Sequence, residues 1–330
     1  MRPNARNVYL DLFKYFLSFL VILIHVTQKD YDFHPLFRLA VPMFFLISGY
    51  FLYASDKETA LHNAKRFIPR TLKYFLIGFG FYIVFDFIMC YVNGNGVGYY
   101  FTTLFYKDFL LEFIFLNQPI TYTGAQLWFL IALLVLSVVH WLAVKFDLTK
   151  YYKFAIPVGF AIYFFFAGYM YLFQETDMPI YYTRNAWFMG LPLFALGYLL
   201  AKVDLHKRSW YKYVYLAVGV GAFFFQIIEA RLAVMEMYIS GVISAVMLLA
   251  FFLGLKKSRS DFYYRWFGKD GPFYIYILHM AVSEVLSKLA SFDSGLVKCC
   301  VVFGISLAVY EVCFLLTKLY RRVKTQPAET

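Results

Sequence analysis

Long apolar runs recur along this chain, and they constrain its fold more than any other feature. Each approaches the roughly 20 residues that a helix needs to cross the hydrocarbon core of a bilayer. Because backbone polar groups in lipid must be satisfied within the segment, such runs become helices. We therefore predict an all-α integral membrane protein, a bundle of about ten transmembrane helices. The runs cover residues 8–28, 37–54, 72–92, 126–146, 154–173, 186–201, 213–229, 235–255, 272–290 and 298–319.

The composition agrees with this fold class, since only 15% of the residues are charged and 62% are apolar. An average soluble domain has about 25% charged residues. The aromatic segment 97–118 is interrupted by glycines, and we interpret it as a shorter interfacial or re-entrant element. No polar cleavage region follows the first run, so we expect that run to be retained as a helix. Residues 1–330 are predicted to form a single membrane domain.

The distribution of Lys and Arg predicts the orientation. With the N-terminus inside, the inner segments hold 24 of the 31 basic residues and the outer segments hold 7, as the positive-inside rule requires. Both termini are then cytoplasmic. Basic inner loops and their contacts with membrane lipids explain most of the net charge of +11, so no nucleic-acid partner is needed. The cysteines are expected to be packing residues in helices, and no metal site is predicted: Cys90, Cys299, Cys300 and Cys313.

Four polar residues share one helical stripe of the first run: Asp11, Lys14, Ser18 and His25. Ionisable groups at this depth must face protein or water, which makes them functional candidates. Lys14 and His25 are eleven residues apart and project from one face, about 16 Å apart along the axis. The helix therefore carries a charge at its start and an acid/base group near its end. A plainer interpretation is that His25 donates to a backbone carbonyl.

Arg38 is predicted to neighbour His25, because the two lie at the outer ends of consecutive spans. A nearby cation disfavours protonation of an imidazole and keeps its lone pair available for general-base or nucleophilic work. Three intramembrane carboxylates could orient His25 or pair with Lys14, and we favour structural pairing for each: Asp86, Glu229 and Glu311.

The run from Arg38 to Tyr50, RLAVPMFFLISGY, is typical of one family. Taken with Asp11, Lys14, His25 and two later patterns, it resembles the acyltransferase 3 family of membrane O-acyltransferases, which includes enzymes that acetylate bacterial surface polysaccharides. The resemblance spans about residues 8 to 320 and implies a bundle of about ten helices with cytoplasmic termini, in the bacterial cytoplasmic membrane. The later patterns are Leu127–Trp128–Phe129 and Ile275–Tyr276–Ile277–Leu278–His279.

In that family an Arg or Lys precedes the catalytic His by eleven residues, and the matching positions here are Lys14 and His25. Many members with polysaccharide substrates have Arg there and carry a close arginine pair at the start of the third helix. This chain offers Arg66 and Arg70, four residues apart, with Lys73 beyond them. Because Lys lacks the planar fork that suits phosphate, Lys14 is expected to make a point-charge contact or a structural pair with Asp11.

The resemblance implies transfer of an acyl group, most simply acetyl, from cytoplasmic acyl-CoA to a hydroxyl of an envelope glycan or lipid-linked sugar. No tightly bound cofactor is implied. His25 and Arg38 are the predicted catalytic residues, and we favour His25 as general base over a covalent acyl-histidine. The predicted donor-binding residues are Lys14, Arg66, Arg70 and Lys73.

Trp128 and His279 are predicted to contact the acceptor, although lipid-facing or interfacial packing would also account for Trp128. A second interpretation of the chain is an amino-acid transporter or sensor. The membrane domains of certain serine racemases belong to the same family and are associated with amino-acid uptake.

Overall fold

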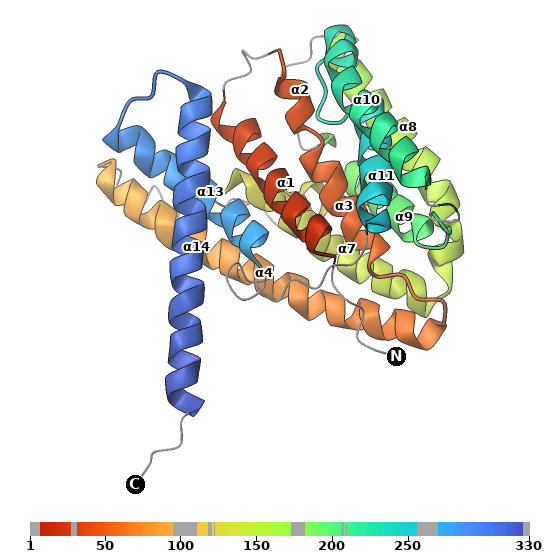
Figure 1. Cartoon of the computed structure of the whole chain (residues 1–330), viewed down its shortest axis with the longest axis horizontal. Coiled ribbons are helices and arrows are strands. Elements are labelled where there is room, and N and C mark those ends of the chain that lie inside the picture. The colour runs from red at the N-terminus through yellow and green to blue at the C-terminus, as the bar shows by residue number, and fades with distance from the viewer. Residues whose placement is uncertain are drawn as a thin grey trace. The chain divides into compact units, whose positions relative to one another are not determined.

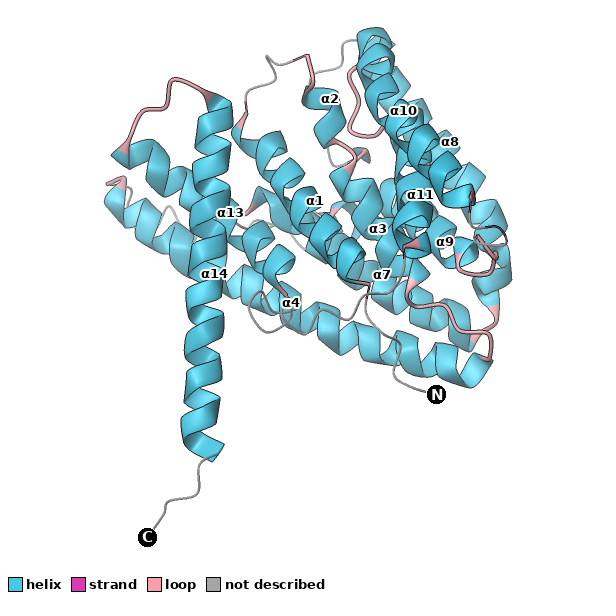
Figure 2. Ribbon diagram, viewed as in Figure 1, coloured by secondary structure: helices cyan, strands magenta, loops and turns pink. Residues whose placement is uncertain are grey.

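The computed structural model describes residues 7–27, 32–94, 111–117, 121, 123–172, 182–205, 208, 210–255 and 270–325. Within these ranges every regular element is a helix, which confirms the all-α prediction (Figure 2). The contacts divide the chain into two compact units, one of Met1–Phe37 with Leu255–Thr330 and one of Arg38–Gly254. The single membrane domain stays a prediction.

All ten predicted runs overlap described helices, but their lengths differ. The second run gives only α3 (Ala40–Tyr50), which has 11 residues and is too short to cross a bilayer alone. Residues 95–110, which hold most of the interrupted aromatic segment, lie outside the described part of the chain. The apolar helices identify the chain as a multi-pass membrane protein. The number of ten transmembrane helices and the cytoplasmic position of both termini stay predictions. Six described helices are long and apolar enough to span: Val8–Val26, Lys57–Val92, Ala125–Lys145, Leu148–Tyr169, Tyr211–Leu232 and Gly295–Tyr320.

In the first unit, α1 packs against both α13 and α14. The Ser18 hydroxyl of α1 donates to the Lys14 carbonyl at 2.9 Å and lies 3.1 Å from the Pro272 carbonyl, which links α1 to the first turn of α13. Gly271 permits this approach, because a Cβ there would lie 2.0 Å from the Tyr15 hydroxyl oxygen. The start of α13 therefore lies beside the middle of α1. The unit contains α1 (Val8–Val26), α2 (His34–Phe37), α13 (Gly271–Leu289) and α14 (Gly295–Thr325) (Figure 1).

The second unit is built from pairs of packed helices: α3 with α9, α4 with α7, α8 with α9, and α10 with α11. Short π and 3-10 turns precede several of them: η1 (Glu112–Leu116), η2 (Ala125–Leu127), η3 (Leu148–Tyr151) and η5 (Ala186–Gly190). The helices are α3, α4 (Lys57–Val92), α7 (Trp128–Lys145), α8 (Tyr152–Leu172), α9 (Leu191–Leu200), α10 (Tyr211–Leu232) and α11 (Ile239–Gly254).

The start of α4 corrects the sequence analysis, which placed it near residue 72. The helix begins at Lys57 and has 36 residues, a length of about 54 Å that exceeds the roughly 30 Å hydrocarbon core. Asp56 caps it by accepting the Thr59 N–H at 2.7 Å, and the hydrogen bonds from Thr59 lower the pKa of the Asp56 carboxyl. The basic residues of the first turns lower the hydropathy without opposing a helix, so apolar runs alone missed this part.

Pairings within the second unit agree with the predicted alternation of its spans. Lys57 forms an ion pair with Asp147, and both lie in segments predicted inside. Glu236 contacts Arg38 and Arg184; Arg38 and Glu236 lie at the predicted outer ends of their runs, and Arg184 lies in a loop predicted outside. Each group of paired residues therefore lies at one side of this unit, as the predicted topology requires, while the number and orientation of the spans stay predictions.

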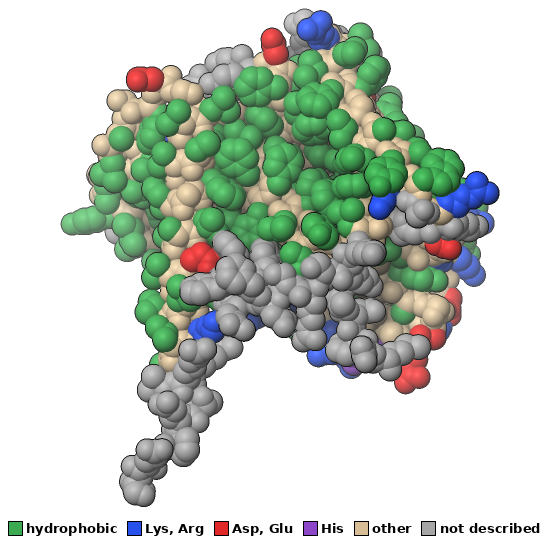
Figure 3. Space-filling model, viewed as in Figure 1, with side chains coloured by type: hydrophobic (Ala, Val, Ile, Leu, Met, Phe, Trp, Pro, Cys, Tyr) green, Lys and Arg blue, Asp and Glu red, His purple; other side chains and the backbone are tan. Residues whose placement is uncertain are grey.

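Apolar side chains cover much of the described surface on the face that Figure 3 shows. On α10, Phe224 and Ile228 are 56% and 55% exposed, and on α14, Val312 and Leu316 are 54% and 59% exposed. Soluble proteins rarely expose contiguous apolar surface of this kind, so these faces suit contact with lipid.

The α3–α9 interface depends on two glycines. A Cβ on Gly197 would lie 2.1 Å from the Leu46 carbonyl oxygen, and one on Gly49 would lie 1.9 Å from the Phe194 carbonyl oxygen. The clashing atoms belong to the backbone and cannot rotate away. Small residues at helix interfaces in membranes permit such close backbone approach.

We predict that Gly197→Ala destabilises the protein by about 1–3 kcal/mol, because overpacking forces the backbones of α3 and α9 apart. Thermal unfolding in detergent measures the change. The matched control is Gly221→Ala on α10, where no described atom would lie within 4 Å of the new Cβ. Equal melting temperatures for the two variants would contradict the interpretation.

Candidate functional site

Two histidines meet in the first unit. His25 lies in the last turns of α1 and His279 in α13, and their ring centroids are 5.4 Å apart with an interplanar angle of 38°. Ser18 and Pro272 make contact seven residues earlier on each helix, so α1 and α13 run in the same direction. The sequence analysis gave the two histidines separate roles, and the structure brings them together.

The surroundings of His279 define which of its nitrogens is an acceptor. The residue is fully buried, and its Nδ1 lies 2.6 Å from the carbonyl oxygen of Tyr276. A carbonyl only accepts hydrogen bonds, so Nδ1 is the protonated nitrogen and Nε2 carries the lone pair. Nε2 is buried and has no hydrogen-bond partner among the described residues.

Lys14 lies on α1 and forms an ion pair with Asp11, with 2.9 Å between Nζ and Oδ1. This confirms the structural pair that was expected for a lysine at this position. The side chain of Lys14 is half-buried, at 26% exposure. Its contact with a donor phosphate stays a prediction.

Arg38 lies in the second unit and does not act there as an isolated cation. Its guanidinium contacts Oε2 of Glu236, and Nε of Arg184 lies 2.7 Å from the same oxygen. The side chain of Arg38 is only 8% exposed, so the ion pair is largely buried. Sequence reasoning missed both partners, although an acidic residue at the edge of an apolar run was a usable signal for Glu236. The predicted contact of Arg38 with His25 stays a prediction.

Two of the three intramembrane carboxylates have structural roles. Asp86 is buried and accepts the Thr123 N–H at 3.2 Å and its hydroxyl. Glu229 accepts the N–H groups of Ile239 and Ser240 at 2.8 and 3.0 Å, and so caps the start of α11. Structural pairing is therefore confirmed for Asp86 and Glu229.

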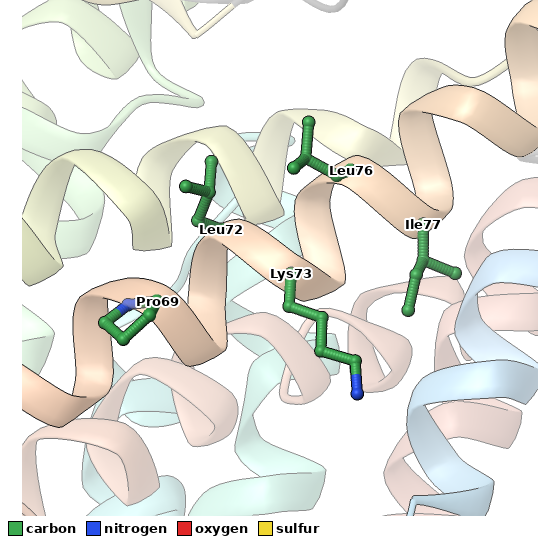
Figure 4. A pocket seen from close by; sticks show the side chains of 5 residues that line it. All are labelled: Pro69, Leu72, Lys73, Leu76 and Ile77. Carbon is green, nitrogen blue, oxygen red and sulfur yellow. The ribbon is translucent and has the colours of Figure 1, made fainter.

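The three predicted donor-binding cations of α4 are exposed: Arg66, Arg70 and Lys73. Within the described residues none of them forms an ion pair. Arg70 stacks over the Tyr74 ring at 5.7 Å from its centroid. Lys73 lines a pocket of about 380 Å³ whose other described walls are Pro69, Leu72, Leu76 and Ile77, all from one face of α4 (Figure 4).

Trp128 is the first residue of α7 and is buried at 9% exposure, so the lipid-facing interpretation is wrong. Its ring centroid lies 6.3 Å from that of Phe45 on α3. Because α7 is apolar on all sides, its sequence pattern does not show which face is buried. Contact of Trp128 with an acceptor stays a prediction.

The apolar helices and the pair of imidazoles, one buried and one half-buried, define a multi-pass membrane protein with acid/base groups among its helices. The sequence profile of the acyltransferase 3 family, described as an acyltransferase domain, matches residues 7–316. The chain belongs to this family and is a membrane acyltransferase. Comparisons with curated proteins and with solved structures give no match.

We predict that Glu236→Gln destabilises the protein by about 3–5 kcal/mol, because it leaves two largely buried guanidinium groups without their shared carboxylate. The control is Lys57→Gln, which removes an ion pair whose side chains are 54% and 66% exposed and should cost less than about 1 kcal/mol. Thermal unfolding in detergent compares the two. A loss of stability for Glu236→Gln as small as that of the control would show that the two arginines find other partners.

Proposed function

We propose that this protein is a membrane O-acyltransferase that moves an acyl group, most simply acetyl, from cytoplasmic acyl-CoA to a hydroxyl of an envelope glycan or lipid-linked sugar. The membrane is the bacterial cytoplasmic membrane. The observation that carries the proposal is the placement of His25, beside a second imidazole and on the same helix as the Lys14 ammonium. Family membership favours transfer over the transporter or sensor interpretation.

In the proposed reaction, His25 takes the proton of the acceptor hydroxyl as its oxygen attacks the thioester carbonyl carbon. The carbon–sulfur bond then breaks, and the departing thiolate recovers the proton from His25. The ester and the free thiol are the products, and His25 returns to its neutral form. A positioned general base of this kind contributes about 10²- to 10⁴-fold in rate.

The proposed donor site uses cations that described acidic groups do not neutralise. Arg66 and Arg70 present exposed guanidinium groups that suit phosphate, and Lys73 adds a point charge beside apolar side chains. Lys14 contributes less to donor binding in this scheme, because Asp11 compensates part of its charge. A phosphate-rich donor would therefore depend most on α4.

We predict that His25→Ala lowers acyl transfer by about 10²-fold or more while the protein remains in the membrane, since the variant loses the general base but little helix packing. Transfer of radiolabelled acetyl from acetyl-CoA to glycan in membranes measures the rate. Phe16→Ala, at a 45% exposed position of the same helix, is the control and should retain activity. Near-normal transfer by well-expressed His25→Ala would exclude His25 as the base.

We predict that Arg70→Ala raises the KM for acyl-CoA by about tenfold and leaves the acceptor requirement unchanged, because one charge-assisted phosphate contact is lost. Lys14→Ala should have a smaller effect in the same direction. Steady-state kinetics in membrane vesicles separate the two substrates. Lys57→Gln removes a cation from the same helix and is expected to behave as wild type; a rise in acceptor KM alone for Arg70→Ala would contradict the assignment.

A further inference from the structure

We infer that His279 is a positioning residue for His25, with its Nε2 accepting the ring N–H of His25 during acyl transfer. This inference rests on the proposed function of His25 as general base. It assigns His279 a role that differs from the acceptor contact predicted from the sequence.

The unsatisfied acceptor on His279 is the first argument. Buried polar atoms in proteins almost always have a hydrogen-bond partner, and those that do not require an explanation. Nε2 of His279 is such an atom within the described residues, in a side chain with no exposed surface. An imidazole ring, that of His25, lies 5.4 Å away between centroids. It offers an N–H donor of the kind that Nε2 lacks.

The second argument is that His279 is held rigidly as an acceptor. Its Nδ1–H is bound by the Tyr276 carbonyl of its own helix at 2.6 Å, so the lone pair stays on Nε2. The two helices are fixed in register seven residues earlier, where the Ser18 hydroxyl meets the Pro272 carbonyl. Gly271 packs beside Tyr15 at the same level. These contacts between α1 and α13 therefore help to place the histidine pair.

The chemistry requires no proton on His279. When His25 takes the acceptor's proton, both of its ring nitrogens carry N–H, and the N–H that faces His279 donates to Nε2. His279 stays neutral, stabilises the imidazolium and fixes which His25 nitrogen faces the acceptor. The proton returns from His25 to the thiolate. Catalytic hydrogen bonds are often longer without substrate and tighten in the reacting complex, so we expect the His25 ring to rotate toward Nε2 during the reaction.

The test compares two variants of His279 with opposite expectations. His279→Gln keeps an oxygen acceptor near the position of Nε2, whereas His279→Leu fills similar space without an acceptor. We expect His279→Leu to lower kcat by about 10²-fold with an unchanged acyl-CoA KM, and His279→Gln to retain most of the rate. A purely structural role predicts the reverse order, because leucine is the better buried residue. Val285→Ala, at a 39% exposed position of α13, is the control.

A second readout does not depend on acyl transfer. Diethyl pyrocarbonate modifies the free lone pair of an imidazole, and mass spectrometry follows its addition to His25 in the full-length membrane protein. We expect slower modification of His25 in His279→Leu than in wild type or His279→Gln. Unchanged kcat and unchanged His25 modification in His279→Leu would overturn the inference.

The two proposals fail in different ways. If His25→Ala abolishes transfer but His279→Leu does not, only the role of His279 is wrong. If wild type transfers no acyl group, the proposed function is wrong, and the modification rate of His25 still decides whether the two imidazoles are coupled. In the double variant His25→Ala/His279→Leu, we expect no loss beyond that of His25→Ala, because residues that act as a unit are not additive. If the rate of the double variant instead fell by the product of the two single-variant losses, the inference would also be overturned.

Discussion

The need to pair polar groups inside an apolar helical bundle organises this structure. Neither lipid nor packed aromatic side chains offer hydrogen bonds, so a charged or polar group at depth is stable only with a partner. Glu236 forms ion pairs with Arg38 and Arg184. Asp86 accepts hydrogen bonds from Thr123, and Glu229 accepts them from the first residues of α11. The contacts of Glu236 and Asp86 connect segments that are distant in sequence, whereas those of Glu229 join two consecutive helices. His279 Nε2 is one of several buried side-chain atoms that depart from this rule within the described residues, as does Nε2 of His140. It attracts a functional interpretation because a second imidazole, that of His25, lies beside it.

Backbone approach between helices is the second constraint, and it is set by glycine. Gly49 and Gly197 bring α3 and α9 into direct contact, and Gly271 brings the first turn of α13 onto α1. Van der Waals packing drives helix association in membranes, where water does not separate apolar surfaces. At Gly49 and Gly197 an added Cβ would meet backbone atoms of the facing helix, so the helices would have to move apart, whereas at Gly271 it would meet the Tyr15 side chain.

The positive charges fall into two kinds, and the difference bears on function. Arg38 and Arg184 are committed to Glu236, and this buried cluster ties together connections of the second unit. Arg66, Arg70 and Lys73 are exposed on α4. Arg66 and Arg70 precede the part of the helix that apolar patterning predicted, and Lys73 lies at its start. Such exposed cations remain able to bind a phosphate-rich donor, whereas a buried, compensated arginine mainly stabilises the fold.

The sequence by itself determined the helical class, the approximate positions of the helices and the polar stripe of α1. Apolar run length and the helical period are properties of a single segment, so they can be read without knowing its neighbours. It also predicted the Lys14–Asp11 pair, whose members are three residues apart. Only the tertiary structure decided that Glu236 pairs with Arg38, 198 residues away, and that His279 faces His25. The sequence of a helix that is apolar on all sides does not show which of its faces packs against another helix. Because this packing determines which polar groups become neighbours, the partners of buried polar groups could not be predicted from the sequence.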